Sequence, residues 1–284
     1  MSARIIDGAA MAREVLGELR ARATRLAQLG RPAGLAVLLV GDDPASAVYV
    51  RSKERACLDA GVQTFDTRLP ATTTEQELLR RIDALNADHQ VHGILVQMPL
   101  PAHMDSVRIL QRIDAAKDVD GFNWRNLGAL LDGHTVLAPC TPSGVMVMLE
   151  RSGIAIAGRH AVVIGRSSIV GKPVALMLLE RHATVTVCHS RTTDLAAITR
   201  QADILVAAVG RPRMVTASMV KAGAAVIDVG INRLPDGKLC GDVDFAAVRE
   251  CAGWITPVPG GVGPMTVAMV ITNVIAAAEQ SARS

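Results

Sequence analysis

The chain has 284 residues, of which 50% are apolar and 20% charged, and its formal net charge is +3 at pH 7. This is the balance of a globular protein with ample apolar material for a core, and the length favours two domains. The small net charge, with no run of Lys or Arg, gives no support for nucleic-acid binding.

Short β-rich apolar runs alternate with longer helical patterns in the first part of the chain. The pattern predicts strand, helix, strand, helix and strand over residues 35–40, 45–60, 62–69, 75–87 and 93–97. Continuous apolar strands separated by helices indicate a parallel sheet with both faces covered.

Residues 118–144 break this rhythm, because they are rich in turn formers, and we place the domain junction there. A second series of strands is predicted at residues 160–164, 183–187, 204–209 and 225–229, all but the last followed by a helical stretch. This is the pattern of a doubly wound α/β sheet. Residues 265–282 predict one long closing helix that crosses back to the first domain.

A glycine-rich turn connects the strand at 160–164 to a helix at 174–180. It contains Gly165, Arg166 and Ser167 and ends at Gly171, so its spacing departs from GxGxxG. Such a turn lets backbone N–H groups and the helix N-terminus face a phosphate, which favours dinucleotide binding over a plain tight turn.

The end of the next strand distinguishes NADP from NAD. An NAD site usually has an acidic residue there, which holds the ribose hydroxyls. Here the strand continues into Cys188-His189-Ser190-Arg191, without an acid. Ser190 and Arg191, with Arg166 on the first loop, are suited to a 2′-phosphate, so we expect NADP. The alternative is that Ser190 and Arg191 form a solvated loop.

Four polar residues in the first half are candidates for chemistry. Tyr49 and Lys53 are four residues apart and share one face of a predicted helix, as many surface pairs do. Gln97 ends a buried strand, where parallel sheets bind ligands, although it could simply cap the strand. Asp120, with Asp118, lies in a turn-rich loop, where turn formation is the default role of acids. No nearby residues complete a metal site, so we expect no metal.

A second glycine- and proline-rich loop, residues 257–266, precedes the closing helix and contains Pro259, Gly260 and Gly261. Loops of this kind expose backbone and often pack against flat ligands, and the following helix N-terminus favours anions. A purely structural loop is the alternative.

The five cysteines are isolated and odd in number, which indicates reduced thiols in a cytoplasmic protein. The first residues have no apolar run typical of a signal peptide. The late apolar stretch at 267–278 is too short to span a bilayer and contains Thr272 and Asn273. We therefore expect a soluble protein without a membrane partner.

Together these segments closely resemble the bifunctional methylenetetrahydrofolate dehydrogenase/methenyltetrahydrofolate cyclohydrolase (FolD) family. The resemblance rests on segments in family order along nearly the whole chain: SAVYVRSK, GILVQMPLP, KDVDGF, PCTPSG, GRSSIVGKP, GDVDF and TPVPGGVGPMT. QMPLP and PGGVGPMT are the most specific of them. The family fold is two αβ domains with an active-site cleft between them, and its members are usually homodimers.

The resemblance implies an NADP-dependent enzyme of one-carbon metabolism that oxidises 5,10-methylenetetrahydrofolate and hydrolyses the methenyl product. It implies that Lys53 is the catalytic lysine, that Gln97 is its hydrogen-bonding partner and that Tyr49 stacks on the aminobenzoyl part of folate. Asp120 would anchor the pterin. The implied cofactor residues are Gly165, Arg166, Ser167, Ser190, Arg191 and Ile231, and the implied substrate residues include Pro259, Gly260 and Gly261.

The expected domains are residues 1–120 with 268–284, which bind folate, and residues 121–267, a Rossmann-type NADP domain. Asn123-Trp124 replaces the His-Pro of many relatives, which could alter the pterin end of the pocket. Arg55 replaces a frequent second lysine, and Ala222 a frequent proline. Two alternatives to the bifunctional enzyme remain open: a dehydrogenase with little cyclohydrolase activity and a non-catalytic nucleotide-binding relative. Without the resemblance, an amino-acid or shikimate-type dehydrogenase is equally compatible with the pattern.

Overall fold

The computed structural model describes residues 2–282, except for the side chains of three residues of one helix, at 44, 45 and 48. The chain forms two compact units, each built on a parallel sheet. The four-stranded unit comprises Arg13–Cys140 and Val267–Ser284, and the six-stranded unit comprises Met1–Ala12 and Thr141–Thr266. Both are α/β, as predicted. Positions 1 and 283–284 of the predicted domains lie outside the described residues.

The sheet of the four-stranded unit is centred on β2, which pairs in parallel with β3, β4 and β5. The strands are β2 (Gly34–Val40), β3 (Gln63–Thr64), β4 (Thr67–Leu69) and β5 (Gly93–Val96). All seven residues of β2 are buried, which explains its uninterrupted apolar sequence. The predicted strand at 62–69 is divided into β3 and β4. Both pair with β2 in the same register, so the division interrupts the hydrogen-bond ladder without shifting the strand.

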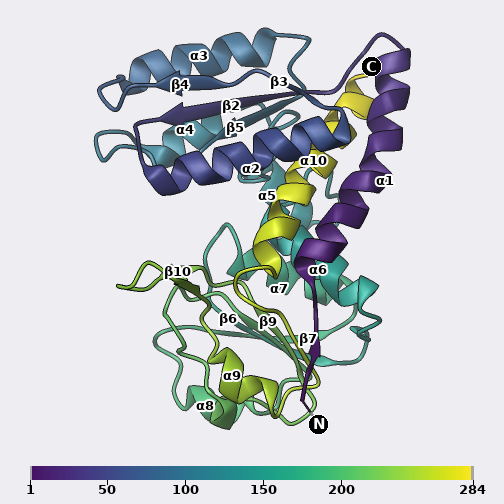
Figure 1. Cartoon of the computed structure of the whole chain (residues 1–284), viewed down its shortest axis with the longest axis vertical. Coiled ribbons are helices and arrows are strands. Elements are labelled where there is room, and N and C mark those ends of the chain that lie inside the picture. The colour runs from purple at the N-terminus through teal and green to yellow at the C-terminus, as the bar shows by residue number, and fades with distance from the viewer. Residues whose placement is uncertain (1, 283–284) are drawn as a thin grey trace. The chain divides into compact units, whose positions relative to one another are not determined.

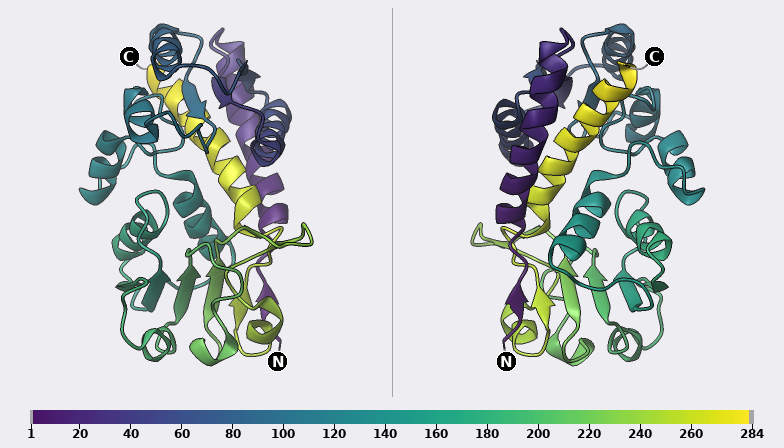
Figure 2. Two further views of the ribbon diagram at one scale, coloured as in Figure 1. Left: turned by 90° about the vertical axis from the view of Figure 1, so that its left-hand side faces the viewer. Right: turned by 90° about the vertical axis from the view of Figure 1, so that its right-hand side faces the viewer.

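Two helices of this unit, shown in Figure 1, were predicted at residues 45–60 and 75–87, and both form within one residue of those bounds. The helices Gly8–Gln28 and Ser106–Arg112 were not predicted. The helix α3 (Glu75–Ala87) begins where Thr74 accepts the N–H of Glu77 in a side-chain cap. It packs with α4 (Ser106–Arg112) on one face of the sheet, where Leu78, Ile82 and Ile109 are fully buried. The other helices are α1 (Gly8–Gln28), α2 (Pro44–Ala60) and α5 (Trp124–Leu131). Figure 2 shows α1 beside the last helix, α10 (Val262–Ser281), where Arg22 and Glu279 form an ion pair at 2.7 Å.

The six-stranded unit has the strand order β1-β12-β9-β8-β6-β7, and every pairing is parallel. The strands are β1 (Arg4–Ile5), β6 (His160–Ile164), β7 (Thr184–Cys188), β8 (Ile204–Ala207), β9 (Ala225–Asp228) and β12 (Trp254–Ile255). The chain leaves β6 toward β7 on one side and returns to β8 on the other. The point between β6 and β8 is therefore the topological switch point at which such sheets bind ligands.

The remaining elements of this unit are short, apart from two helices. They are α6 (Cys140–Arg151), α7 (Gly171–Glu180), α8 (Leu195–Thr199), the 3₁₀ turn η1 (Ala217–Met219), α9 (Phe245–Arg249) and the hairpin β10 (Asn232–Arg233) with β11 (Leu239–Cys240). The predicted strands at 160–164, 183–187, 204–209 and 225–229 are confirmed within two residues. The helical stretch expected after the third of them is only η1.

The units differ from the predicted domains at two stretches and at Val267, which belongs to the four-stranded unit. Residues 1–12 belong to the six-stranded unit, because β1 pairs with β12 in its sheet. Residues 121–140 belong to the four-stranded unit, and α5 forms within the region predicted to be turns. The prediction missed β1 because a two-residue strand leaves no periodic signal, and missed α5 because turn formers surround it.

The closing helix α10 forms as predicted and belongs to the four-stranded unit from Val267 onward. Within the described part of the chain, it is the one helix long and apolar enough to span a membrane by length and composition. Of its most apolar window, 67% is buried inside the protein. Its apolar character is thus accounted for by packing: Ile271, Val274 and Ile275 are fully buried.

Candidate active site

Lys53 and Gln97 form a buried pair in the four-stranded unit. Lys53 lies on α2, which begins where Asp43 accepts the N–H of Ser46 at 2.7 Å. Gln97 directly follows β5, at the carboxyl edge of the sheet. The Lys53 Nζ donates to Gln97 Oε1 at 3.0 Å, and the side chains are only 8% and 9% exposed. The amide of Gln97 in turn donates to the carbonyl of Met98 at 2.8 Å, which fixes its orientation.

Tyr49 lies one turn before Lys53 on α2 and is 38% exposed. It is thus an accessible ring beside a buried lysine, and a flat ligand can reach it. Ser46, a further turn back, is buried, and its hydroxyl donates to the carbonyl of Met98 at 3.4 Å. Ser46 therefore helps to hold α2 against the segment after Gln97. The sequence prediction missed this role, because a serine near a helix start is read as a cap.

Asp120 is brought to the same edge by a loop that continues the sheet. The Ile94 N–H of β5 donates to the Lys117 carbonyl at 2.8 Å. At Gly121, φ is +75°, and a Cβ would lie 2.5 Å from the backbone nitrogen of Pro139, so the tight turn requires glycine. Asp120 is half-buried. Burial raises the pKa of its carboxyl group, and the charge of Lys53 lowers it.

The carboxylate of Asp118 has structural hydrogen-bond partners, whereas that of Asp120 has none among the described residues. Asp118 is 1% exposed and accepts the N–H of Asn123 at 2.7 Å and the side-chain amide of Asn126 at 3.0 Å. Burial raises its pKa to about 6, against the effect of these donors. Asn123 also caps α5 by accepting the N–H of Arg125 at 2.9 Å. Asn123, which departs from the family pattern, therefore helps to hold the Asp120 loop in place through its hydrogen bonds.

Two further buried residues support the Asp120 loop. The amide of Asn273, on α10, donates to the carbonyls of Val119 at 2.8 Å and Ala138 at 2.9 Å. The thiol of Cys140 donates to the same Val119 carbonyl at 3.0 Å. Burial, with the nearby charge of Asp120, raises the pKa of this thiol well above its ordinary value. The one signal in the sequence was a polar residue, Asn273, within an apolar helix.

The glycine-rich turn after β6 lies at the switch point of the six-stranded unit. Gly165 has φ +123°, and a Cβ there would lie 2.2 Å from the carbonyl oxygen of Ala208, which follows β8. Only glycine allows the two loops to approach this closely. Ser167 Oγ accepts the N–H groups of Val170 and Gly171 at 3.2 Å, which shapes the start of α7. Arg166 is exposed beside it.

The other predicted cofactor residues lie along the same carboxyl edge. Ile164 pairs with Cys188, so the loops that begin at Gly165 and His189 leave neighbouring strand ends. Ser190 and Arg191 are exposed there. Ile231, which follows β9, is 45% exposed. The loops that follow β6, β7 and β9 thus present a glycine turn, a cation and an apolar side chain at one edge.

The loop before α10 belongs to the six-stranded unit. Gly261 is buried, and its carbonyl oxygen would lie 2.0 Å from a Cβ at Gly8. The carbonyl of Gly260, with φ +101°, accepts the N–H of Ala9 at 2.9 Å. Pro259 is exposed. The loop is therefore shaped by its packing on the start of α1, and Pro259 is its most accessible member among the three predicted residues.

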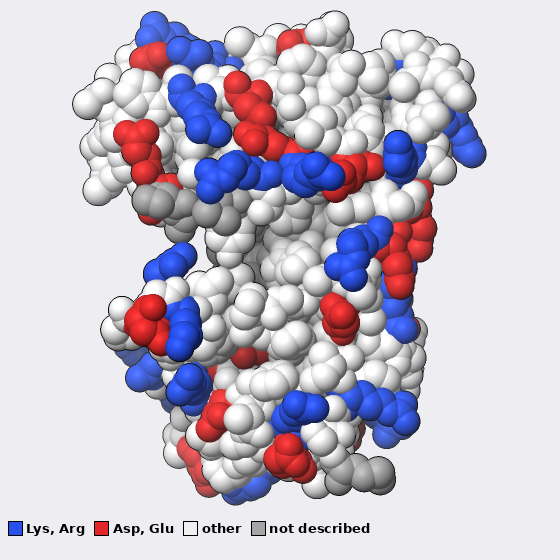
Figure 3. Space-filling model, viewed as in Figure 1, with Lys and Arg blue, Asp and Glu red and all other residues white. Residues whose placement is uncertain are grey.

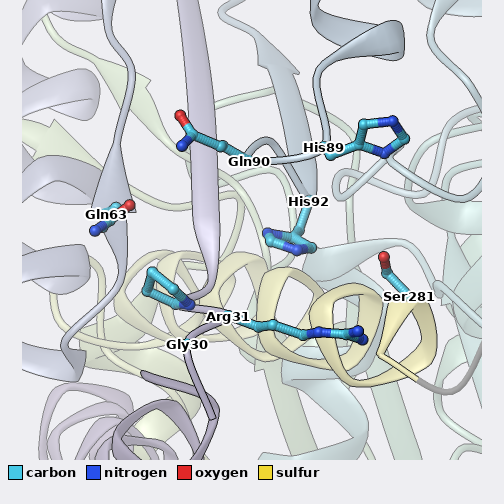
Figure 4. Close-up of a pocket in the computed structure, with 8 residues that line it drawn as sticks. Gly30, Arg31, Gln63, His89, Gln90, His92 and Ser281 are labelled. Carbon is cyan, nitrogen blue, oxygen red and sulfur yellow. The ribbon is translucent and has the colours of Figure 1, made fainter. Parts of the chain in front are cut away.

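A cavity of about 360 Å³ lies at the opposite, amino-terminal ends of β2, β3 and β5 (Figure 4). None of the predicted site residues lines it. Its polar groups hold the fold together: the His92 ring accepts the N–H of Gly34 at 3.2 Å, and Arg31 donates to the carbonyl of Ala282 at 3.1 Å. In Figure 4, the Arg31 side chain extends toward Ser281. Ligands of parallel sheets bind at the carboxyl ends, so the candidate site is at the other edge.

Within residues 2–282, no group of three or more His, Cys, Asp or Glu is placed to hold a metal ion. The five cysteines form no disulfide.

Two family models match the chain. The model described as "Tetrahydrofolate dehydrogenase/cyclohydrolase, catalytic domain" matches residues 6–120. The model described as "Tetrahydrofolate dehydrogenase/cyclohydrolase, NAD(P)-binding domain" matches residues 139–282.

Similar proteins match over the whole length. The "Bifunctional protein FolD" of Nitrosospira multiformis is 58% identical over 99% of this chain and 98% of its own. The crystal structure of the bifunctional dehydrogenase/cyclohydrolase of Campylobacter jejuni is 47% identical, with a TM-score of 0.96 over 98% of this chain and 99% of that one. The Trypanosoma brucei enzyme, solved with NADP cofactor and inhibitor, is 41% identical, with a TM-score of 0.95 over both chains in full.

Proposed function

The chain belongs to the tetrahydrofolate dehydrogenase/cyclohydrolase family, and we propose its function from this membership and from the site. It is a bifunctional enzyme that oxidises 5,10-methylenetetrahydrofolate with NADP and hydrolyses the methenyl product to 10-formyltetrahydrofolate. The main observation behind the assignment is the buried Lys53–Gln97 pair, which lies at the carboxyl edge of the four-stranded sheet, as Asp120 does. The whole-chain relatives do not favour a single-activity or non-catalytic protein.

The folate is bound by residues of the four-stranded unit. Asp120 accepts hydrogen bonds from the amino group and ring N–H of the pterin, which suits a carboxylate better than an amide, because an amide also presents donors. The accessible ring of Tyr49 stacks on the aminobenzoyl group. Pro259, Gly260 and Gly261 are further proposed substrate-binding residues.

In the first reaction, NADP supplies the hydride acceptor. The residues contribute positioning, because hydride transfer needs the methylene carbon held close to the acceptor and shielded from water. Asp120 and Tyr49 fix the two ends of the folate. The product cation is shared by the nitrogens N5 and N10, and no protein base is needed to form it.

In the second reaction, water adds to the methenyl carbon and the bond to N5 opens. A proton must leave the attacking water and another must reach N5. Lys53 is the group in the four-stranded unit placed for this transfer, with its Nζ held 3.0 Å from Gln97 Oε1. Gln97 is a neutral amide, so it directs the amine without adding a negative charge beside it.

The residues at the switch point fit NADP. The close approach of Gly165 and Ala208 leaves no room for a side chain at position 165, so backbone is presented at the start of the turn that faces a pyrophosphate. Gly165, Arg166 and Ser167 therefore hold the phosphates. Ser190 and Arg191 hold the 2′-phosphate, and Ile231 contacts the cofactor after β9.

Replacement of Arg191 by alanine should affect NADP and not NAD. Loss of one charge-assisted contact to the 2′-phosphate should raise the KM for NADP by roughly 10- to 100-fold, because such bonds contribute about 1.5 to 3 kcal/mol. Initial rates with each cofactor measure the effect. Arg159→Ala is the matched control, since Arg159 precedes β6 at the amino end of the same sheet. Equal effects of Arg191→Ala on both cofactors would contradict the assignment.

We further propose a cytoplasmic homodimer that supplies 10-formyltetrahydrofolate, including to purine biosynthesis, with tetrahydrofolate derivatives as its partners. The five free cysteines support a reducing compartment. Basic and acidic side chains are interspersed on the face shown in Figure 3, which supports the expectation that neither nucleic acid nor a membrane is a partner. Sedimentation of the purified chain at several concentrations tests the dimer.

The two activities can be assayed separately. With methylenetetrahydrofolate and NADP, the purified chain should produce NADPH. With methenyltetrahydrofolate alone, it should accelerate the loss of methenyl absorbance over the buffer rate. If the methenyl absorbance is lost only at the buffer rate, the protein is a dehydrogenase without cyclohydrolase activity. Failure of both assays would favour a non-catalytic relative.

A further inference from the structure

Two buried aspartates of the six-stranded unit have no part in the chemistry described above. Asp228 ends β9 and is 3% exposed, and Asp242 follows β11 and is fully buried. Buried carboxylates are costly unless they are hydrogen-bonded, so such a pair needs a structural or functional reason.

The carboxylate of Asp242 accepts four hydrogen bonds. Its Oδ2 accepts the N–H groups of Val209 at 2.7 Å and Gly210 at 3.0 Å. Its Oδ1 accepts the N–H of Arg211 at 2.8 Å and the side-chain amide of Asn232 at 2.9 Å. Three successive backbone N–H groups of the loop after β8 therefore converge on one carboxylate, which defines the course of that loop.

Asp228 forms the second half of the arrangement. Its Oδ1 accepts the N–H groups of Gly230 at 3.0 Å and Asp242 at 2.9 Å, and its Oδ2 accepts the N–H of Val243 at 2.9 Å. Asp228 thus holds the backbone of Asp242 in place. Two glycines make room for the pair: a Cβ at Gly230 would lie 2.3 Å from the Asp242 carboxyl, and one at Gly241 would lie 1.8 Å from Asp228 Oδ2.

The segments that the pair holds lie at the cofactor edge. The loop of residues 209–211 follows Ala208, whose carbonyl oxygen leaves no room for a Cβ atom at Gly165. Ile231 lies between Gly230, which donates to Asp228, and Asn232, which donates to Asp242. The two aspartates therefore fix the loops after β8 and β9 relative to the glycine turn after β6.

We propose that Asp242 is a positioning residue for the dinucleotide, which orders the loop 209–211 and Ile231 while remaining too deeply buried to touch the cofactor. Asp228 orients Asp242 for this task. The inference rests on the proposed use of NADP by this edge. It predicts that the Asp242 carboxylate governs cofactor affinity and leaves folate chemistry in the four-stranded unit intact.

The test is Asp242→Asn, which keeps the shape but turns one acceptor oxygen into an NH₂ group facing backbone N–H donors. The dissociation constant for NADP, measured by calorimetry, should rise by roughly 10-fold or more. Hydrolysis of methenyltetrahydrofolate needs no cofactor and should stay within about twofold of the unchanged chain. Asp244→Asn is the matched control: it lies two residues along and caps α9 without a side-chain hydrogen bond.

A second variant covers the case in which Asp242→Asn fails to fold. Asn232→Ala removes one donor and leaves the three backbone donors on Asp242. It should raise the dissociation constant for NADP by roughly threefold with hydrolysis unchanged. The inference is overturned if the folded Asp242→Asn variant binds NADP as the unchanged chain does, or if it loses NADP affinity and hydrolysis in parallel. If Asp242→Asn does not fold, the inference is overturned when Asn232→Ala leaves NADP affinity unchanged. If the unchanged chain bound no NADP, the proposed function would fail instead.

Discussion

Replacement of Lys53 by methionine should abolish most of the hydrolysis of methenyltetrahydrofolate while a larger share of the NADP-dependent oxidation survives. Methionine preserves much of the length and apolar volume of the buried side chain but cannot transfer a proton. The loss expected for removing a general acid–base group is roughly 10²- to 10⁴-fold. Oxidation depends on positioning and needs no protein base, so it should fall less. Stopped-flow measurement of each half-reaction, with saturating substrate, gives the two rates.

Lys221→Met is a suitable control for this experiment. Lys221 is an exposed lysine of the six-stranded unit that pairs with Asp203 at 2.7 Å, so the same chemical change there should leave both rates near their starting values. Folate affinity should be measured for both variants. If Lys53→Met lost oxidation and hydrolysis equally while still binding folate, Lys53 would have no distinct part in proton transfer.

Replacement of Asp120 by alanine should chiefly weaken folate binding. Each strong hydrogen bond between a carboxylate and the pterin contributes about 1.5 to 3 kcal/mol, so the KM for methylenetetrahydrofolate should rise by roughly 10- to 100-fold or more. The KM for NADP should change little, because the predicted cofactor residues all lie in the other unit. Among the described residues, no donor is hydrogen-bonded to the Asp120 carboxylate, in contrast to that of Asp118, so its removal leaves no donor unsatisfied and should not lower the free energy of unfolding much.

Asp118→Ala should show the opposite pattern. Asp118 accepts two hydrogen bonds from buried donors, and its loss leaves both unsatisfied. The free energy of unfolding should fall by about 1 to 3 kcal/mol or more. The two acids, which are separated by one residue, thus have separate roles. Removal of Asp118 should lower stability, and removal of Asp120 should lower folate affinity. A drop in melting temperature for Asp120→Ala as large as that for Asp118→Ala, with unchanged folate affinity, would contradict the pterin assignment.

Much of the fold follows from local sequence signals. The helix α3 matches its predicted bounds because Thr74 marks its start and apolar residues recur at helical spacing up to Ala87. The strands β2 and β6 were predictable because buried parallel strands are continuous apolar runs. The two-residue strands β1, β3 and β12 are defined by pairing partners far along the chain, and no local pattern encodes that.

The site was predictable to a smaller degree. Spacing placed Tyr49 and Lys53 on one helix face, but the partnership of Lys53 with Gln97 joins residues 44 positions apart. It was expected only because the chain resembles a known family. The supporting residues Ser46, Asn273 and Asp242 were missed, since each acts through hydrogen bonds to distant backbone groups. A polar residue in an apolar segment is the one local sign of such roles.

The central claim is that one chain carries out both reactions at one lysine-containing site. The most direct test follows NADPH, methenyltetrahydrofolate and 10-formyltetrahydrofolate together in a single reaction of the purified chain with methylenetetrahydrofolate and NADP. The account predicts that 10-formyltetrahydrofolate forms in step with NADPH while little methenyl compound lingers. Accumulation of methenyltetrahydrofolate in amounts equal to NADPH, with hydrolysis no faster than in buffer, would contradict it.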